Sequence, residues 1–516
     1  MTLLPVIMAL LPVIAIFLLL TIRKTAADTA GLAGWAVVLA VACLYFRTPL
    51  AVALRASAGG VVASFPISLV VATSIFQVTL LIETGALGRV IALIKTVSPE
   101  SRAAQIMLIN IGVGTLLTAL GAVPVSILPP IMIGLGYTTF TAIALPAIGY
   151  DALCTYALLG IPIVVFSNFV GKPVAEVGHY FARFMPVISS CIALGMLWLA
   201  GKGKFLKQGA VPALAAGLTA GFTAIGMNAL GLVTLTGIAA GLAVIGVMLV
   251  YLKATGRTLI DRSVLSEADR ANEKRMSLAA SLSPWLILIV CCLLLNAPFL
   301  PFLSWTFKKL EMALPIIPGA PEKVRLFWQA YFWILVSSIL AFPFLKPSRE
   351  KLRRVRDKWL KRAPRPVFAA AIFFAIAFVI NHSGKNEAFQ LIEPGRNMVH
   401  VLAGAAASAF GKMYVVVAPF LGLLGGFISG SESSAIAMLT PLHLSTAERI
   451  GAVGLLVAAA SGIGGGLASV ISPAKLQNAA ASIDRIGEET RVIPVAFTIS
   501  ITITLICSLL ALFWAY

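Results

Sequence analysis

Long apolar runs, separated by short polar segments, dominate the pattern of this 516-residue chain. Examples are LLPVIMALLPVIAIFLLL at residues 3–20, WLILIVCCLLL at residues 285–295 and ISITITLICSLLALFW at residues 499–514. An apolar helix of about 20 residues crosses roughly 30 Å of hydrocarbon. The runs of this kind predict about 11–14 transmembrane helices, and therefore an all-α polytopic membrane protein.

Composition agrees with this pattern. The chain is 59% hydrophobic and 11% charged, with a mean hydropathy of +0.99, whereas soluble domains carry about 25% charged residues. The first run has no basic segment before it and is followed by Arg23. That order predicts a retained first span with its N-terminus outside, and not a cleaved signal peptide.

The formal net charge of +19 is concentrated in loops. The most basic is KPSREKLRRVRDKWLKRAPR at residues 346–365, and the segments at residues 201–207 and 253–275 are basic as well. Cytoplasmic loops of membrane proteins carry an excess of Lys and Arg. We therefore expect these loops to face the cytoplasm, with anionic lipid as a lesser alternative partner, and we expect no nucleic-acid partner.

The residues that could bind a metal or a cofactor show no suitable spacing. Six cysteines and four histidines are scattered through the chain, and no G-x-x-x-x-G-K-[ST] loop is present. The cysteines are therefore interpreted as small apolar residues. We expect neither a metal nor a cofactor, and ATP hydrolysis by this chain is disfavoured.

Two segments of the chain form an internal repeat. Residues 116–165 align without a gap on residues 427–476, which places Gly160-Ile161-Pro162 on Ile471-Ser472-Pro473. Each copy has a short interrupted apolar segment, a polar turn, a long apolar run and a small-residue break before a proline. Paired broken segments in two halves are typical of secondary transporters with inverted repeats and a site at the midplane. We therefore expect two inverted repeats, each with a broken or re-entrant hairpin.

The repeat divides the chain into four predicted regions. They are N-terminal spans at 1–58; repeat 1 at 59–200, with a hairpin near 116–135 and a second break near 150–162; scaffold spans and basic loops at 201–365; and repeat 2 at 366–516, with a hairpin near 427–440 and a second break near 461–473.

Three acidic residues lie within or beside apolar runs, namely Glu83, Asp151 and Glu432. An acid at the bilayer centre costs about 2.5–3.5 kcal/mol on insertion scales, so such residues are usually shielded, paired or protonated. Glu83 ends its run, which favours a membrane-interface position. Asp151 is either a turn residue at a break or a functional residue.

Glu432 lies in a polar segment between apolar runs. Its neighbours are Ser429, Gly430, Ser431, Ser433 and Ser434. A helix that restarts after these serines presents its N-terminus and hydroxyl groups to a carboxylate. The alternative is a capping box, in which Glu432 bonds backbone amides. At the second break, Ser472 precedes a new helix, and Lys475 either meets an anionic substrate or extends to the membrane surface.

At these positions the sequence resembles the lactate permease family of bacterial 2-hydroxymonocarboxylate transporters. The resembling segments are SPESRAAQIMLINIGVGTLLTALGAVPVSI, LLGIPIVV, VINHSG, PFLGLLGGFISGSESS and ISPAKLQNAAASI, in the family's order. The resemblance implies transport of lactate-like anions driven by a proton gradient, in the cytoplasmic membrane of a prokaryote. It also implies kinship with folds of two inverted repeats, some of which move substrate by an elevator motion.

The chain departs from the family at the site itself. Where the family's first hairpin usually carries a glutamate, this chain has Thr118, and the segment GYDALCTYAL replaces an expected Asn-Thr pair. Glu432 stands where the family usually has aspartate. The chain is therefore interpreted as a divergent member, for which a related small organic anion fits as well as lactate.

These observations predict a proton symporter for a small organic anion such as lactate, glycolate or a related 2-hydroxy carboxylate. We expect Glu432 to carry the coupling proton, with Asp151 in reserve, because a neutral Glu432 does not repel an incoming anion. The residues expected to bind the anion are Thr118, Gly121, Ser429, Gly430, Ser431, Ser433, Ser472 and Lys475. Alternatives are a sodium-coupled carrier, a cation/proton antiporter and, less favoured, a membrane-embedded enzyme. Both monomers and homo-oligomers fit the sequence.

Overall fold

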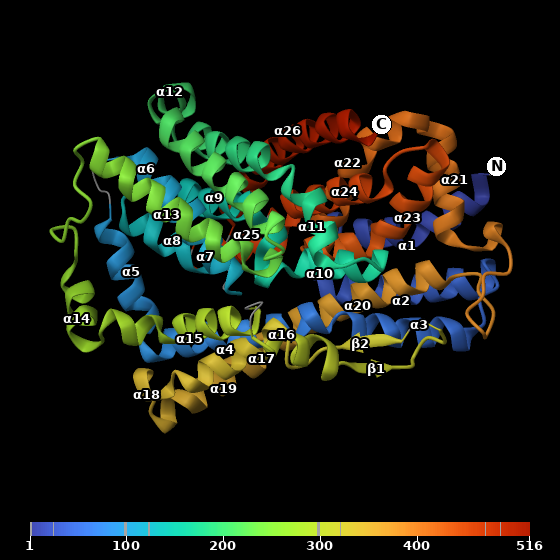
Figure 1. Cartoon of the computed structure of the whole chain (residues 1–516), viewed down its shortest axis with the longest axis horizontal. Helices are drawn as coiled ribbons and strands as arrows, with labels where there is room; N and C mark the ends of the chain where they lie inside the picture. Colours follow the sequence, from blue (N-terminus) through green and yellow to red (C-terminus); the bar gives the residue numbers. More distant parts are fainter. Residues whose placement is uncertain are drawn as a thin grey trace.

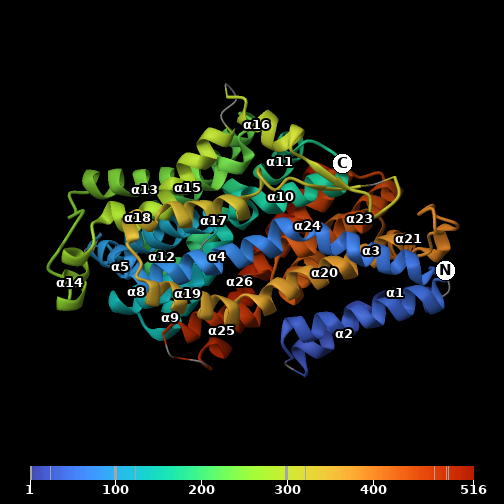
Figure 2. The ribbon, with the colours of Figure 1, turned by 90° about the horizontal axis from the view of Figure 1, so that it is seen from below.

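The fold is all-α apart from one short hairpin, as a computed structural model of the chain shows (Figure 1). The structure describes residues 3–23, 25–97, 101–121, 124–296, 300–319, 321–469, 471–483, 485 and 487–516. Helices α5 and α14 lie at one end of the molecule, and α21 and α23 lie near the other (Figures 1 and 2).

The helices follow one another with short connections, and α and η denote helices and 3-10 or π-helical turns. The N-terminal part forms α1 (Leu3–Thr21), α2 (Ala27–Ala40), η1 (Val41–Tyr45), α3 (Leu50–Ala63), α4 (Phe65–Thr84) and α5 (Ala86–Thr96). The next part forms α6 (Arg102–Ile106), η2 (Met107–Val113), α7 (Gly114–Ala119), α8 (Pro124–Gly134), α9 (Thr139–Tyr150), η3 (Asp151–Tyr156), α10 (Ala157–Val170) and α11 (Val174–Ala182).

The central part contains the hairpin, in which β1 and β2 pair antiparallel with Met312 opposite Val324. It forms α12 (Met185–Ala229), η4 (Val233–Leu235), α13 (Thr236–Ala254), α14 (Glu267–Arg275), α15 (Leu278–Asn296), α16 (Phe302–Ser304), η5 (Trp305–Lys309), β1 (Met312–Leu314), β2 (Glu322–Val324), α17 (Ala330–Leu340), α18 (Phe342–Leu345) and α19 (Arg349–Arg362). The last part forms α20 (Pro364–His382), η6 (Pro394–Arg396), α21 (Met398–Phe410), η7 (Gly411–Met413), α22 (Tyr414–Ser429), α23 (Glu432–Ile450), α24 (Gly454–Ser469), α25 (Pro473–Ala481) and α26 (Glu489–Ala515).

Ten described helical stretches are long and apolar enough to cross a membrane, which confirms a polytopic α-helical membrane protein. One of them, α12, is a hairpin of two helices. Its backbone leaves helical geometry at Gly201 and Lys202, and Gly217 and Gly221 then pack against the backbone of Ser190 and Pro186. Counting α12 as two spans adds one to these ten, which reaches the lower end of the predicted range of about 11–14.

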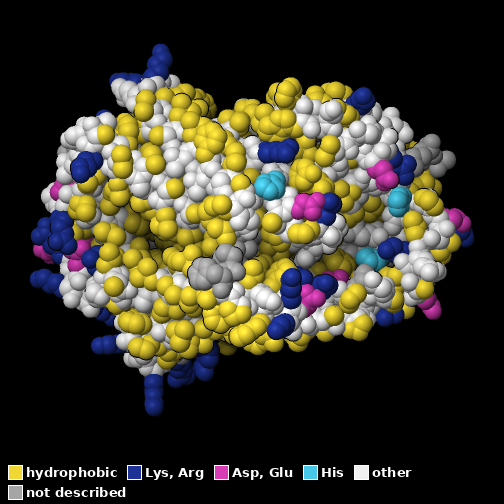
Figure 3. Space-filling view, in the orientation of Figure 1, with side chains coloured by type: hydrophobic (Ala, Val, Ile, Leu, Met, Phe, Trp, Pro, Cys, Tyr) yellow, Lys and Arg dark blue, Asp and Glu magenta, His cyan; other side chains and the backbone are white. Residues whose placement is uncertain are grey.

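The outer surface is largely apolar, as expected for contact with lipid. Figure 3 shows hydrophobic side chains over most of one face, while Lys and Arg gather at the end that carries α14 in Figure 1. Large apolar side chains on the outside include Phe513, Leu44 and Leu3, which are 82%, 83% and 72% exposed. The hydrocarbon of a bilayer is the environment that stabilises such a surface.

The elements of the predicted repeat occur in the same order in both halves. Helices α7 and α22 each end before a glycine with positive φ, Gly121 at 84° and Gly430 at 64°, and a second helix follows. In each half a later break precedes a proline, at Pro162 and Pro473. The opposite orientation of the two halves stays a prediction, and so do the four regional boundaries.

The basic segment at 346–365 is mainly helix α19, which packs against α4. The Trp359 indole N–H donates to the Ala72 carbonyl over 2.8 Å, and Lys358 and Arg354 pair with Glu83 at 2.6 Å and 3.5 Å. Glu83 thus has cationic partners at the end of its apolar helix, as an interface position requires. The cytoplasmic location of the segment stays a prediction.

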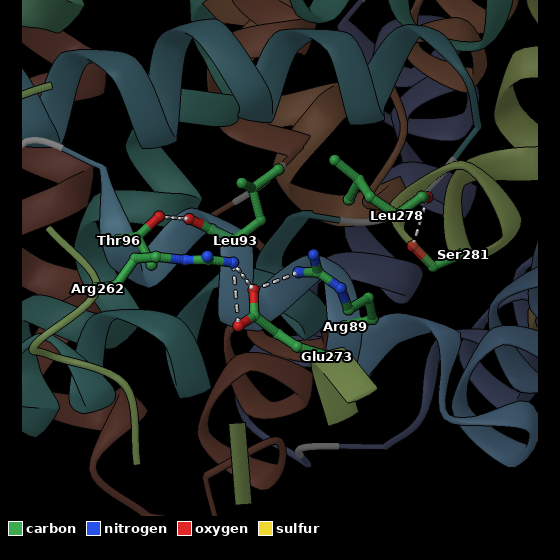
Figure 4. Close-up of polar contacts among 7 residues, drawn as sticks. All are labelled: Arg89, Leu93, Thr96, Arg262, Glu273, Leu278 and Ser281. Carbon is green, nitrogen blue, oxygen red and sulfur yellow. Dashed lines mark hydrogen bonds and ion pairs between the residues drawn. The ribbon is translucent and has the colours of Figure 1, made fainter. Parts of the chain in front are cut away.

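A second basic segment is fixed by ion pairs to α5. Figure 4 shows Arg89 and Arg262 reaching the same Glu273 carboxylate, at 3.2 Å each. One turn earlier on α14, Asp269 pairs with Lys95 at 3.0 Å and closes a capping box with Ser266. Because the Arg89 and Lys95 side chains are mostly shielded from solvent, these pairs anchor the 255–277 connection to the helical bundle.

Candidate functional site

The tip of the second hairpin is built from its serines and one glycine. Helix α22 ends at Ser429, Gly430 turns the chain, and the Ser431 hydroxyl caps α23 by accepting the Ser434 amide at 3.3 Å. The Ser429 hydroxyl donates to the Gly425 carbonyl over 2.8 Å. Gly430 is required here because its φ of 64° is costly for residues with a side chain.

Glu432 occupies the first turn of α23 but reaches across to the first half of the chain. It is 3% exposed, and its Oε1 accepts a hydrogen bond from the Thr155 hydroxyl over 2.7 Å. The other oxygen, Oε2, is buried without a hydrogen-bond partner in the described structure. A buried polar atom without a partner is costly, so Oε2 is available to a proton or to a ligand.

Glycines on α24 make room for the Glu432 carboxyl group. A side chain at Gly466 would place its Cβ 2.7 Å from Oε2, and one at Gly465 would come within 2.8 Å of Ala435.

The second break of this half lies beside the hairpin tip. The Ser472 hydroxyl is buried without a hydrogen-bond partner in the described structure, 3.2 Å from the Cβ position of Gly430.

The partner of Glu432 belongs to a break in the first half. Thr155 lies in η3, and the three residues Leu158, Leu159 and Gly160 that follow have φ of 54°, 61° and 75°. This left-handed geometry costs about 1–2 kcal/mol for each residue with a side chain, and it persists only where the surroundings impose it.

Hydrogen bonds from α12 fix the first-half break. The Asn228 amide donates to the Tyr156 hydroxyl over 2.9 Å, and the Ser189 hydroxyl donates to the Ala152 carbonyl over 2.8 Å. The break is therefore anchored on both sides of Thr155, and Thr155 presents its hydroxyl to Glu432 from a defined position.

The first hairpin tip contacts the same break. A side chain at Gly121 would meet Leu158 and the Ser74 hydroxyl, and the nearby Thr118 hydroxyl is buried without a partner in the described structure. Residues 151–160 therefore touch Gly121 on one side and Glu432 on the other. Ala122 and Val123 lie outside the described residues, and a substrate cavity between the two tips stays a prediction.

The structure thus gathers most of the predicted site residues around one break. Six of them lie together in the second half of the chain, namely Ser429, Gly430, Ser431, Glu432, Ser433 and Ser472. Thr118 and Gly121, at the tip of the first hairpin, approach the break at residues 151–160. The Lys475 ammonium lies 5.1 Å from the centre of the Tyr150 ring and is half-buried. The Asp151 backbone opens η3, while its side chain lies outside the described part of the chain.

Several residues of the site did not stand out in the sequence. Thr155 lies in the segment GYDALCTYAL, where the departure from the family pattern was the signal, but nothing local pairs it with Glu432. Ser74 lies in an ordinary apolar run. Gly466 lies in the glycine-rich segment of the predicted second break, but its contact with Glu432 was not predicted. Their proximity to the site depends on how distant helices pack, which local patterns do not specify.

Comparison with known proteins places the chain in a family. The family model described as L-lactate permease matches residues 5–516. The L-lactate permease of Escherichia coli strain K12 is 24% identical, over 98% of this chain and 95% of its own, and the glycolate permease GlcA of the same strain is 24% identical, over 98% and 95%. The solved structure of the Alcanivorax borkumensis YdaH transporter aligns with a TM-score of 0.44 and 13% identity, over 89% of this chain and 87% of its own. Because the family model covers almost the entire sequence, the chain belongs to the L-lactate permease family.

Proposed function

We propose that this protein is a proton-coupled carrier of small 2-hydroxy monocarboxylates, such as lactate or glycolate, in the cytoplasmic membrane of a prokaryote. Its relatives carry the names of L-lactate and glycolate permeases. Lactate and glycolate are anions that share a carboxylate and an adjacent hydroxyl. The buried Glu432 carboxyl group, bonded to Thr155 of the other half, is the observation that carries the coupling.

The coupling follows from charge. An ionised Glu432 repels a carboxylate that approaches the break, whereas a protonated Glu432 is neutral and its O–H can donate to the anion. Glu432 and the bound anion together then carry one negative charge, where an ionised Glu432 would give two. Proton and anion therefore bind together, which is the requirement for symport.

Unpaired hydroxyls and helix ends supply the anion site. Ser472 and Thr118 each carry a buried hydroxyl without a partner in the described structure, and α23 and α25 begin beside the break. A helix N-terminus carries partial positive charge and free amides, which stabilise an anion. Lys475, near the start of α25, adds a cation that can approach the carboxylate.

Uptake by proteoliposomes tests this function. We expect labelled lactate or glycolate to accumulate when the lumen is alkaline, with no requirement for sodium. Accumulation that follows an imposed sodium gradient but not a pH gradient would support the sodium-coupled alternative. Cation exchange for protons without any carboxylate uptake would support the antiporter, and either result would overturn the proposal.

A further inference from the structure

A buried chain of hydrogen bonds lies in the second half, away from the break. His443 of α23 is fully buried between α22 and α24. Its Nδ1 lies 2.8 Å from the Tyr414 hydroxyl, and its Nε2 lies 2.6 Å from the Ser461 hydroxyl. Both ring nitrogens are therefore engaged with groups that can accept and donate a proton.

His443 faces the same side of α23 as Glu432. The two are 11 residues apart, which at 3.6 residues per turn is about three turns and roughly 16 Å along one face. Thr440 lies between them, and its hydroxyl is buried without a partner in the described structure, like Glu432 Oε2. Pro441 has no amide hydrogen, so the Ala437 carbonyl loses its helical partner.

Polar groups thus continue from His443 towards Glu432 inside an otherwise apolar bundle. Buried polar groups of this kind normally have a hydrogen-bond partner, often water. The Thr440 hydroxyl, the Ala437 carbonyl and Glu432 Oε2 are each able to bind a water molecule. A path for protons needs such groups, whereas simple helix packing does not.

The other end of the hydrogen-bond network is the buried Tyr414, which lies close in sequence to a surface pocket. Tyr414 begins α22 directly after the η7 turn, whose Gly411 and Lys412 line an open pocket of about 370 Å³ together with Arg449 of α23. His400 of α21 lies within electrostatic range of Arg449 and the neighbouring Glu448. Met413 alone separates Lys412, which lines this pocket, from Tyr414 in the sequence.

We infer that Tyr414, His443 and Ser461 form a proton relay between this surface pocket and Glu432, an inference that rests on the proposed function. With its proton on Nε2, His443 accepts a proton at Nδ1 from Tyr414 and releases the Nε2 proton to Ser461. The Tyr414 hydroxyl regains a proton from the pocket, and the Ser461 hydroxyl passes its own on towards Glu432. The ring is neutral before and after the transfer, so no buried charge persists. It ends with its proton on Nδ1, so the ring and its two hydroxyl partners reorient before the next transfer.

The test compares two transport modes of His443→Gln in proteoliposomes, each normalised to folded protein. Gln keeps a hydrogen-bond donor and an acceptor at this position but cannot pass a proton, so we expect uptake driven by a pH gradient to slow by on the order of 10-fold or more. Exchange of labelled for unlabelled lactate needs no release of the proton and should stay unchanged. His382→Gln, at a half-buried histidine stacked on Phe378, is the control.

Three outcomes decide the inference. If His443→Gln loses gradient-driven uptake but keeps exchange, the result supports the relay. If it loses both, His443 only holds the helices together, and the relay is overturned. Normal gradient-driven uptake overturns the relay as well. If His443→Gln does not fold, Tyr414→Phe and Ser461→Ala each remove one link and decide by the same comparison. If Glu432→Gln loses accumulation while His443→Gln accumulates lactate normally, the relay alone is overturned. If Glu432→Gln accumulates lactate normally, the proposed coupling through Glu432 is contradicted.

Discussion

At the scale of single residues, hydroxyl groups around the break have two different roles. The Thr155 hydroxyl donates a hydrogen bond to the Glu432 carboxyl group, and the Ser431 hydroxyl caps α23, so both already have partners within the protein. The Ser472 hydroxyl has no partner in the described structure although it is buried. Substitutions should therefore separate coupling, stability and substrate affinity.

Thr155→Val keeps the shape of the side chain and removes its hydroxyl. Hydrogen bonds to charged groups contribute about 1.5–3 kcal/mol, so we expect a weaker dependence of uptake on the pH gradient and a lower thermal stability. Thr498→Val is the control, because Thr498 is exposed and bonds only a carbonyl of its own helix among the described contacts. Equal behaviour of the two variants in uptake and thermal unfolding would refute the role of Thr155.

Ser472→Ala and Ser431→Ala should behave differently. Loss of a Ser472 hydrogen bond to an anion should weaken affinity roughly 10- to 150-fold with normal folding. Loss of the Ser431 cap should lower helix stability by about 1 kcal/mol, with a smaller effect on affinity. Binding titrations and thermal unfolding of both variants measure this, and normal affinity in Ser472→Ala would move the anion elsewhere.

The same residues show what local sequence could reveal. A glutamate among serines inside an apolar chain predicted a buried functional acid, because such a group is too costly without a reason. Its partner Thr155 is 277 residues away, so only the packing of the two halves brings them together. The hydrogen bonds of the buried His443 could likewise not be predicted from the sequence, because its partners Tyr414 and Ser461 lie on other helices.

At the scale of elements, glycine and proline indicate where helices are interrupted, but not the geometry of the interruption. Breaks near Gly160 and Pro473 were predicted from residue type, since both residues disfavour a continuous helix. The left-handed backbone at Leu158 and Leu159 was not predictable, because leucine rarely adopts it. The fold-back inside α12 lies at the start of the basic segment 201–207, which was predicted as a loop, but the close contacts between its two arms had no local signal.

Gly466→Ala tests the packing of α24 against Glu432. A methyl group there would lie 2.7 Å from Oε2, so the carboxyl group must move, and overpacking of this kind typically costs about 1–3 kcal/mol. We expect reduced accumulation and lower thermal stability. Gly246→Ala on α13 is the control, because no atom lies within 4 Å of its Cβ position. Unchanged transport in Gly466→Ala would contradict the tight fit around Glu432.

At the scale of the whole molecule, charge sets the orientation. The basic α19 and the connection that carries α14 should both face the cytoplasm, because Lys and Arg are retained on that side. The structure pairs Glu83, at the end of α4, with two cations of α19. Sequence could predict this sidedness from composition, but not that α19 packs along α4.

Cysteine labelling checks this orientation. Arg353→Cys on the exposed face of α19 should resist a membrane-impermeant thiol reagent on intact cells and react after permeabilisation. The unsubstituted chain, which has six cysteines of its own, gives the background. Ready labelling of intact cells would reverse the assigned topology.

The central claim is that the proton carried by Glu432 couples the gradient to the anion. Glu432→Gln imitates the neutral form permanently, so we expect the variant to bind lactate and to exchange it across the membrane at a rate close to that of the unsubstituted protein. It should not accumulate lactate when a pH gradient is imposed, since no proton is taken up or released. The measurement is the ratio of exchange to gradient-driven accumulation in proteoliposomes, normalised to folded protein. Full proton-driven accumulation by Glu432→Gln would contradict the account and direct the same test to Asp151→Asn.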